Sequence, residues 1–232
     1  MSADFDRWAC GYEQSPLQPI FQAAHEAAII QADRLCWCPR RILDIGCGTG
    51  RLLRSASAAF PAATLVGLDP SRKMLLGADP SGPIALTQAR AERLPYADGS
   101  FDLVLATSSY RHWSDPRAAL REVRRVLSPL GWLVLADMFS ARRRLFRSGR
   151  PNPLPAGLRA ALAEADLAAA EVEVVPGYGP IPSITTLAAH PSRHPRDAAA
   201  GDLATPVAVP GPRTRYVIDA IATALTTPTR PR

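Results

Sequence analysis

Three glycines at alternate positions give the clearest sign of ligand chemistry in this chain. They lie in the segment ILDIGCGTGR, residues 42–51, where Gly46, Gly48 and Gly50 follow an apolar run and precede a helix-forming stretch. Glycine permits a tight turn and leaves backbone N–H groups bare, so a ligand can approach them closely. The spacing therefore predicts a site for a nucleotide-like ligand where a buried strand turns into a helix.

The same spacing excludes two common kinds of nucleotide site. A dinucleotide fingerprint, G-x-G-x-x-G, would need a third glycine at position 51, but that residue is Arg51. A phosphate-binding P-loop would need Gly-Lys-Ser/Thr after the turn, and this sequence does not follow it. The ligand must therefore differ from a dinucleotide or a nucleoside triphosphate.

Two acidic residues narrow the choice of ligand. Asp44 lies two residues before the first glycine, where its carboxylate would repel a pyrophosphate and attract a cationic amine. Asp69, in LVGLDPS, lies 19 residues beyond Gly50, where an acid can accept both hydroxyls of a ribose. Adenosine joined to a cationic amino-acid tail is S-adenosylmethionine, which we expect as the cofactor, with S-adenosylhomocysteine as its product.

The elements that would position these residues alternate between strand and helix from about residue 41 to 190. This alternation is typical of βαβ units and a mostly parallel sheet. A helix is expected to start at Pro116 with Asp115 as its cap, and another to include residues 158–165. Seven strands are expected, at residues 41–45, 64–68, 84–88, 101–106, 132–137, 171–175 and 183–189.

Three regions are expected along the chain. Residues 1–40 are predicted to form a helical lid, because the segment from Pro16 to Leu35 has helical spacing, and residues 41–190 the core. Residues 191–232 are rich in Pro and Ala and are predicted to be a largely flexible tail with one possible helix. An arginine-rich segment, residues 142–150, is expected to be a mobile loop, with an acidic partner as the alternative.

Four motifs together resemble the class I S-adenosylmethionine-dependent methyltransferases, in the small-molecule branch related to ubiquinone and menaquinone methyltransferases (methyltransferase type 11). They are ILDIGCGTGRLL, LVGLDPSRKML, AERLPYADGSFDLVLA and ALREVRRVLSPLGWLVLAD. The resemblance extends over about residues 4–190, since FDRWACGYEQSPLQ is similar to the lid segment of many such enzymes. It implies a Rossmann-like α/β fold with helices on both faces of a seven-stranded sheet, in the order 3-2-1-4-5-7-6, with the last strand antiparallel.

The resemblance also implies roles for single residues. Asp44 and the turn from Gly46 to Gly50 would hold the methionine end of the cofactor, Asp69 the ribose, and Met74 one face of the adenine. Further cofactor contacts are implied for Cys47 and Gly48 within the turn, for Tyr12 in the lid, for Ala91 and Glu92 at the adenine edge, and for Thr107 after the fourth strand.

Two positions depart from the family pattern. Arg90 stands where the family usually has an acid that accepts from the adenine amino group, and a guanidinium offers no acceptor. The Glu92 side chain or a backbone carbonyl could replace that acceptor, with Arg90 stacked on adenine or turned to solvent. Leu130 stands where the family prefers glycine, which predicts a type I turn that ends at Gly131.

The loop TSSYRHW, residues 107–113, falls where the family commonly places acceptor-site residues. It lacks Asn/Asp-Pro-Pro-Tyr/Phe, which argues against methylation of an adenine or of a glutamine amide. His112 is the first candidate for a general base, although such a histidine can instead dock the loop. His25 is the second, unless it only packs within its helix. Tyr110 and Trp113 are predicted to contact the substrate as an aromatic wall, with a place in the core as the alternative.

The predicted function is therefore methylation of a small molecule, with oxygen ahead of carbon or nitrogen as the acceptor atom. The rival hypothesis keeps the fold but not the reaction, with the pocket repurposed in a cyclase or a binding scaffold; Arg90 favours it. All but one of the 27 basic residues are arginine, the exception being Lys73. This bias is typical of a GC-rich bacterial genome and suggests specialised metabolism.

Composition also sets expectations about partners and location. The net charge of +6 is spread along the chain, which argues against nucleic acid as a partner. No run approaches the roughly 18 apolar residues of a membrane span, and MSADFDRW lacks the apolar core of a signal peptide. We expect a cytoplasmic monomer or homodimer, with reduced cysteines and no metal site.

Overall fold

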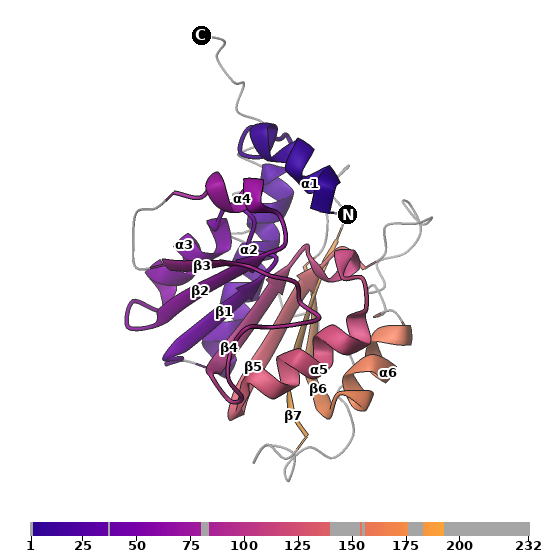
Figure 1. Ribbon diagram of the computed structural model, residues 1–232. Helices are drawn as coiled ribbons and strands as arrows, with labels where there is room; N and C mark the ends of the chain where they lie inside the picture. Colours follow the sequence, from indigo (N-terminus) through magenta and orange to yellow (C-terminus); the bar gives the residue numbers. More distant parts are fainter. Residues whose placement is uncertain are drawn as a thin grey trace.

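The computed structural model describes residues 2–36, 38–79, 84–139, 154, 156–175 and 183–192. Figure 1 shows a twisted sheet with helices on both of its faces. The strands are β1 (Arg41–Ile45), β2 (Thr64–Asp69), β3 (Ile84–Gln88), β4 (Phe101–Thr107), β5 (Leu127–Asp137), β6 (Leu167–Val175) and β7 (Ile184–Pro191). The helices are α1 (Ser2–Trp8), α2 (Gln18–Leu35), α3 (Arg51–Ala59), α4 (Arg72–Leu76), α5 (Pro116–Val126) and α6 (Ala156–Glu164), with short 3-10 helices η1 (Ala9–Gly11) and η2 (Tyr110–His112).

The seven strands form one sheet in the order β3-β2-β1-β4-β5-β7-β6. The first five pair in parallel, and β7 runs antiparallel to both β5 and β6. This arrangement confirms the predicted strand order and the antiparallel last strand. Because the chain leaves β1 toward β2 on one side and later returns to β4 on the other, the carboxyl ends of these strands border a crevice where ligands of such sheets bind.

Apolar side chains divide between the two faces of the sheet. Leu43 and Ile45 of β1 join the core beneath α5 and α6, whereas Ile42 joins the core beneath α2 and α3. This alternation follows from the two-residue period of a strand, and both faces are apolar because helices cover each of them. The strand ends that carry the predicted ligand residues are therefore held on a rigid support.

The segment predicted as a lid has two different parts. The apolar face of α2 packs on the sheet beside α3, with Ala24 and Ala28 fully or almost fully buried, so this helix is part of the core layer. By contrast, α1 and η1 lie above the carboxyl ends of the strands and next to α4 (Figure 1). Only this first part of the segment is placed as a cover.

The turn expected to end at Gly131 falls within the span of β5, which starts at Leu127, so the prediction of its type stays a prediction. Gly131 is needed there for a close approach. A Cβ at this position would lie 2.9 Å from Leu127 Cδ2 and 3.1 Å from the carbonyl oxygen of Phe101. The pairing of β4 with β5 shifts register at the same place, between Phe101 and Leu103.

Other boundaries differ by less. The strand predicted from residue 171 starts at Leu167, and the cap predicted for α5 is present, since Asp115 Oδ1 accepts from the backbone N–H groups of Arg117 and Ala118, each at 3.0 Å. The arginine-rich segment 142–150 and the tail from residue 193 lie outside the described residues, so the predictions about them stay predictions.

Candidate active site

The glycine turn between β1 and α3 has the backbone conformation that its sequence predicts. Gly46, Gly48 and Gly50 all have left-handed φ angles, of 79°, 55° and 78°. At Gly46 the loop after β4 comes so near that an added Cβ would lie 2.5 Å from Ser109 Cβ, whereas at Gly48 nothing lies within 4 Å of such an atom. The turn is thus closed on one side and leaves bare backbone facing open space on the other.

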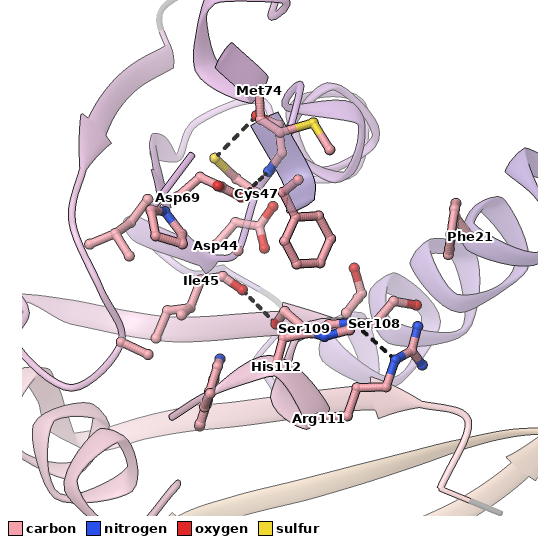
Figure 2. Close-up of a pocket in the computed structure, with 18 of the residues that line it drawn as sticks. Phe21, Asp44, Ile45, Cys47, Asp69, Met74, Ser108, Ser109, Arg111 and His112 are labelled. Carbon is pink, nitrogen blue, oxygen red and sulfur yellow. Dashed lines mark hydrogen bonds between the residues drawn. The ribbon is translucent and has the colours of Figure 1, made fainter. Parts of the chain in front are cut away.

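A cavity of about 500 Å³ lies over this turn, which is within the usual range for small-molecule sites. Figure 2 shows the side chains that surround it. Most of the predicted site residues line its wall, from the strand ends, the adenine-side loop and the covering helices: Tyr12, His25, Asp44, Gly46, Cys47, Gly48, Asp69, Met74, Arg90, Ala91, Glu92, Thr107, His112 and Trp113.

Two predicted residues lie outside the cavity wall. Gly50 is the N-cap of α3 and its left-handed conformation starts that helix, so its contribution is to the shape of the turn. Tyr110 packs its ring against Trp113 and Phe139, with centroids 5.2 and 5.9 Å away, beside the apolar core. This position matches the alternative expectation for Tyr110, a place beside the core.

Asp44 is a buried carboxyl group without a full set of partners. Its side chain is 1% exposed, and its Oδ1 has no hydrogen-bond partner among the described residues. Burial, together with the nearby charge of Asp69, raises the pKa of Asp44 to about 8. An unpaired buried carboxyl costs free energy that a cationic ligand group would recover. This position is suited to an ammonium group.

Asp69 is held in place by the backbone around it. Its Oδ2 accepts from the N–H of Gly48 at 2.9 Å and its Oδ1 from the N–H of Ser71 at 2.8 Å. Burial raises the pKa of this carboxyl group, and the two backbone hydrogen bonds oppose that shift. Each carboxylate oxygen keeps a further lone pair, so Asp69 can still accept hydrogen bonds from a ligand.

The side chain of Arg90 is more than half exposed and turns toward the start of α5. It donates to Ser114 Oγ at 2.5 Å, and its Nε lies 3.6 Å from Glu92 Oε2. Glu92 Oε1 in turn accepts from the backbone N–H groups of Ser114 and Asp115, at 2.6 and 3.1 Å. Glu92 therefore already anchors this loop to α5, and its Oε2 is the oxygen left to serve a ligand.

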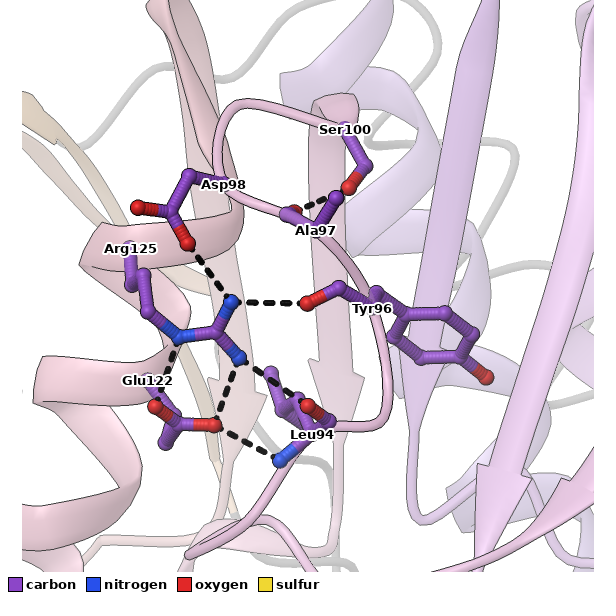
Figure 3. A network of polar contacts seen from close by, with 7 residues as sticks. All are labelled: Leu94, Tyr96, Ala97, Asp98, Ser100, Glu122 and Arg125. Carbon is purple, nitrogen blue, oxygen red and sulfur yellow. Dashed lines mark hydrogen bonds and ion pairs between the residues drawn. The ribbon is translucent and has the colours of Figure 1, made fainter.

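A second anchor for the same loop centres on Arg125 in α5 (Figure 3). Its Nη1 donates to the carbonyl oxygen of Tyr96 at 2.7 Å and to Asp98 Oδ1 at 2.9 Å, and its Nη2 donates to the carbonyl oxygen of Leu94 at 2.9 Å. Glu122 accepts from this guanidinium at 2.8 Å and also from the N–H of Leu94 at 2.8 Å. The loop that carries the predicted adenine-edge residues is thus fixed to α5 at both ends.

This network could not be predicted as a whole from the amino-acid sequence. Glu122 and Arg125 lie within a motif that carried the family resemblance, and their i, i+3 spacing on a helix was a signal that they could act together. Their carbonyl partners in the loop could not be identified from side-chain types, because backbone groups accept from any neighbour.

The covering helices supply an aromatic wall that sequence reasoning identified only at Tyr12. Trp8 lies edge-on to Tyr12 with ring centroids 5.0 Å apart, and Phe21 stacks on Tyr12 at 5.9 Å. Phe5 contacts the ring of His112 edge-on at 4.9 Å. The repeated aromatic residues of the lid segment were the available signal, and they place apolar rings in the wall of the cavity.

Glu13 ties this cover to the glycine turn. Its carboxylate accepts from Thr49 Oγ1 and from Arg51 Nη1, the latter at 2.6 Å. Partial burial opposes ionisation, but these two hydrogen bonds and the charge of Arg51 lower the pKa of Glu13 overall. A second contact joins α1 to α4, because Ser71 Oγ, at the start of α4, donates a hydrogen bond to Asp6 of α1. Neither contact was predicted, since the partners are far apart in sequence.

The two candidate bases are in different surroundings. His25 is 6% exposed, its Nδ1 has no partner among the described residues, and burial followed by the charge of Arg51 lowers its pKa to about 4. His112 Nε2 accepts from Arg111 Nε at 3.1 Å, and burial followed by the charge of Arg111 lowers its pKa. Both imidazoles are therefore weak bases, and His112 already uses the lone pair on Nε2.

A sheet of this order, a left-handed glycine turn and two strand-end carboxyl groups at one cavity are the features expected of a site for S-adenosylmethionine. Solved structures of S-adenosylmethionine-dependent methyltransferases share this fold. Residues 43–135 match the family model described as a methyltransferase domain.

Curated relatives match about half of the chain. A ubiquinone/menaquinone biosynthesis C-methyltransferase of Syntrophotalea carbinolica is 38% identical over 123 residues, which is 51% of this chain and 48% of the relative. A malonyl-[acyl-carrier protein] O-methyltransferase of Geobacter sulfurreducens is 36% identical over 130 residues, 53% and 45% of the two chains. The chain thus spans about half the length of these relatives.

The fold also occurs in a protein named for another reaction. The crystal structure of the [4+2]-cyclase SpnF aligns with a TM-score of 0.58 and 22% identity, over 73% of this chain and 82% of the cyclase. This likeness shows the fold alone. Within the described part of the chain, no helix is long and apolar enough to cross a membrane, and no group of His, Cys, Asp or Glu side chains could hold a metal ion.

Proposed function

We propose that this protein transfers a methyl group from S-adenosylmethionine to an oxygen atom of a small molecule. The observation that carries the proposal is the unpaired, buried carboxyl group of Asp44 beside the bare backbone of Gly48. The carboxyl group of Asp44 suits the cationic amino-acid tail of a ligand. The open backbone at Gly48 lets a ligand approach closely. When bound, S-adenosylmethionine supplies a methyl group on sulfur, and the acceptor's lone pair forms the new bond while the carbon–sulfur bond breaks.

The chain's own residues bind and orient the reactants. Asp44 accepts from the ammonium group, and Asp69 accepts from the ribose hydroxyls through its remaining lone pairs. Met74, which is almost fully buried, and Ala91 supply apolar surface for the adenine. Because the methyl group on sulfur is already activated, methyl transfer mainly needs the acceptor atom, the methyl carbon and the sulfur to be aligned in a dry cavity. We assign the exclusion of water to α1 and η1, which cover the cavity.

The histidines support orientation better than proton removal. The Nδ1 atom of His25 has no partner among the described residues and can form a hydrogen bond with an acceptor hydroxyl, whereas a pKa of about 4 makes the imidazole a poor base near neutral pH. His112 is held by Arg111 and by the ring of Phe5, so we assign it to positioning of the loop.

Several broader predictions stay part of this proposal. A cavity of about 500 Å³, shared between the cofactor and its acceptor, suits a small acceptor better than a base within a nucleic acid. The names of the relatives include both C- and O-methylation, and both acceptors are small or carried groups. A cytoplasmic place in bacterial specialised metabolism, as a monomer or homodimer, fits these observations.

Incubation with S-adenosylmethionine and a panel of small phenols, carboxylic acids and quinols tests the proposal. We expect S-adenosylhomocysteine to form together with a methylated product, both measured by mass spectrometry. The cyclase hypothesis predicts instead that the cofactor binds without being consumed while an acceptor is converted at unchanged mass. Cofactor binding with no methylated product from any panel member would contradict the proposed transfer to these classes of acceptor.

A further inference from the structure

We propose that Arg111 selects the acceptor, and that the acceptor has a flat apolar body and an oxyanion, as in a carboxylate or an ionised phenol or enol. This inference rests on the proposed function and names the substrate class of the same site. It concerns the part of the cavity between the covering helices and the loop after β4, here called the acceptor half.

Apolar side chains dominate the acceptor half. Those that line it from the covering helices and from the end of β5 are Phe5, Trp8, Leu17, Ile20, Phe21 and Met138. Figure 2 shows Phe21 and Arg111 on one side of the cavity, away from Asp44, Asp69 and Met74. Arg51 also lines the cavity, but its Nη1 pairs with Glu13 at 2.6 Å, so we take Arg111 as the cation that faces an acceptor.

The guanidinium of Arg111 is fixed before any acceptor binds. Its Nη1 lies 2.5 Å from Asp137 Oδ1, and its Nε donates to His112 Nε2 at 3.1 Å. Asp137 is 1% exposed at the end of β5, and the N–H of Met138 holds the same oxygen at 2.7 Å. A planar cation held at two of its nitrogens loses little freedom when it binds a further group.

One edge of this cation is left for a ligand. Arg111 lines the cavity and Asp137 does not, so the guanidinium lies between the buried carboxylate and the open space. The Nη2 amino group of Arg111 has no partner among the described residues, and the side chain is 37% exposed. An acceptor that displaces water from this amino group must itself supply a hydrogen-bond acceptor, and an oxyanion satisfies a cation best.

The methyl transfer also favours an acceptor that binds as an oxyanion. His25 is a weak base and His112 has its Nε2 lone pair occupied, so neither is suited to take a proton from a hydroxyl. An acceptor bound as an oxyanion loses no proton. Its lone pair forms the bond to the methyl carbon, and the electron pair of the broken carbon–sulfur bond stays on sulfur. The oxyanion and the sulfonium thereby become two neutral groups. An ionised phenol or enol could react at oxygen or at an adjacent carbon, which agrees with both reaction types among the relatives.

Benzoate and benzamide test the proposal as probes, because they share a flat body and differ in charge. With S-adenosylhomocysteine at saturation, we expect benzoate to bind roughly tenfold or more tightly than benzamide, as for one charge-assisted hydrogen bond, when both are titrated by NMR. Arg111→Gln should remove the preference and Arg111→Lys should retain part of it. Arg124→Gln, which removes a charge from the surface of α5, should leave it unchanged.

Arg111→Gln leaves Asp137 buried without its partner, so the double variant Arg111→Gln/Asp137→Asn provides a second measurement in case the single variant does not fold. Equal affinity for the two probes, absence of benzoate binding, or a preference that persists in the double variant would overturn the proposal. The affinity for S-adenosylhomocysteine should change less than twofold in these variants. Failure of the wild-type chain to bind it would instead contradict the proposed function, and this inference with it.

Discussion

The cofactor half of the cavity is formed by strand ends and backbone, whereas the acceptor half is formed by side chains from the covering helices and the loop after β4. In the cofactor half, Asp69 is fixed by the N–H groups of Gly48 and Ser71, all within one stretch of the βαβ unit. In the acceptor half, Arg111 is fixed by Asp137, a residue from another strand. From this difference we expect the fold to determine cofactor binding, and we propose that the choice of acceptor depends on a few side chains such as Arg111.

The largest effect is expected at the turn that closes the cofactor half. Gly46→Ala places a Cβ 2.5 Å from Ser109 Cβ at a φ of 79°, so left-handed strain and overpacking add together. We expect a loss of about 2–5 kcal/mol in the free energy of unfolding, measured with urea. Gly48→Ala is the matched control, since its φ is also left-handed but its surroundings are open. It should lose only about 1–2 kcal/mol. Equal losses would show that the loop after β4 does not approach Gly46.

A smaller effect is expected from the ribose contact. Asp69→Ala should weaken S-adenosylhomocysteine binding by about 1.5–3 kcal/mol, because a charged acceptor is removed. The matched control is Asp102→Ala, since Asp102 Oδ2 also accepts two backbone N–H groups, of Arg40 and Arg41, but lies outside the cavity wall. Calorimetric titration of both variants distinguishes the loss of a contact with the ligand from the loss of hydrogen bonds to backbone N–H groups. An unchanged affinity in Asp69→Ala would exclude the ribose contact.

The comparison between the halves also explains how far sequence reasoning could reach. The glycine turn, Asp44 and Asp69 were predictable because strand, turn and helix are consecutive, so spacing alone places them together. The pairs Arg111 with Asp137 and Glu13 with Arg51 join segments that only the folded chain brings together.

Two positions show what a linear pattern leaves out. Gly131 was expected to end a turn, and the structure adds its close contact with Phe101 and Leu127 where β4 and β5 shift register. Tyr110 was expected in the cavity because of its neighbours in sequence. The short helix η2 directs its ring toward Trp113 and Phe139 instead, which a linear pattern does not reveal.

The Arg125 network offers a test of how strongly the scaffold supports the cofactor half. Arg125→Gln removes donors to Leu94, Tyr96 and Asp98 and so loosens the adenine-side loop without touching the ligand. We expect S-adenosylhomocysteine affinity to fall by about 1 kcal/mol, as for a lost hydrogen-bond contribution. Arg124→Gln changes the same charge on the same helix, and among the described residues the ion-pair partner of Arg124 is Asp166, at 3.4 Å, which is not part of that loop. Its affinity should stay at the wild-type value; equal effects of both variants would indicate a general charge effect.

The smallest effect is expected at Arg90, whose side chain is largely exposed and bonded to Ser114 and Glu92. If Glu92 or a backbone carbonyl serves the adenine amino group, Arg90→Asp should change cofactor affinity by no more than about 1 kcal/mol. Titration of the wild-type chain and of Arg90→Asp with S-adenosylmethionine measures this difference in affinity. Tightening by several-fold would instead show that the native chain lacks this acceptor, and would favour a repurposed pocket.

The most direct test of the account is a calorimetric titration of the full chain with S-adenosylhomocysteine. Because Asp44 is an unpaired buried carboxyl group beside the glycine turn, we predict saturable binding of one ligand per chain, and weaker binding by Asp44→Asn, which cannot pair with the ligand's ammonium as a charge. Absence of binding to the wild-type chain would contradict the assignment of this cavity to the cofactor.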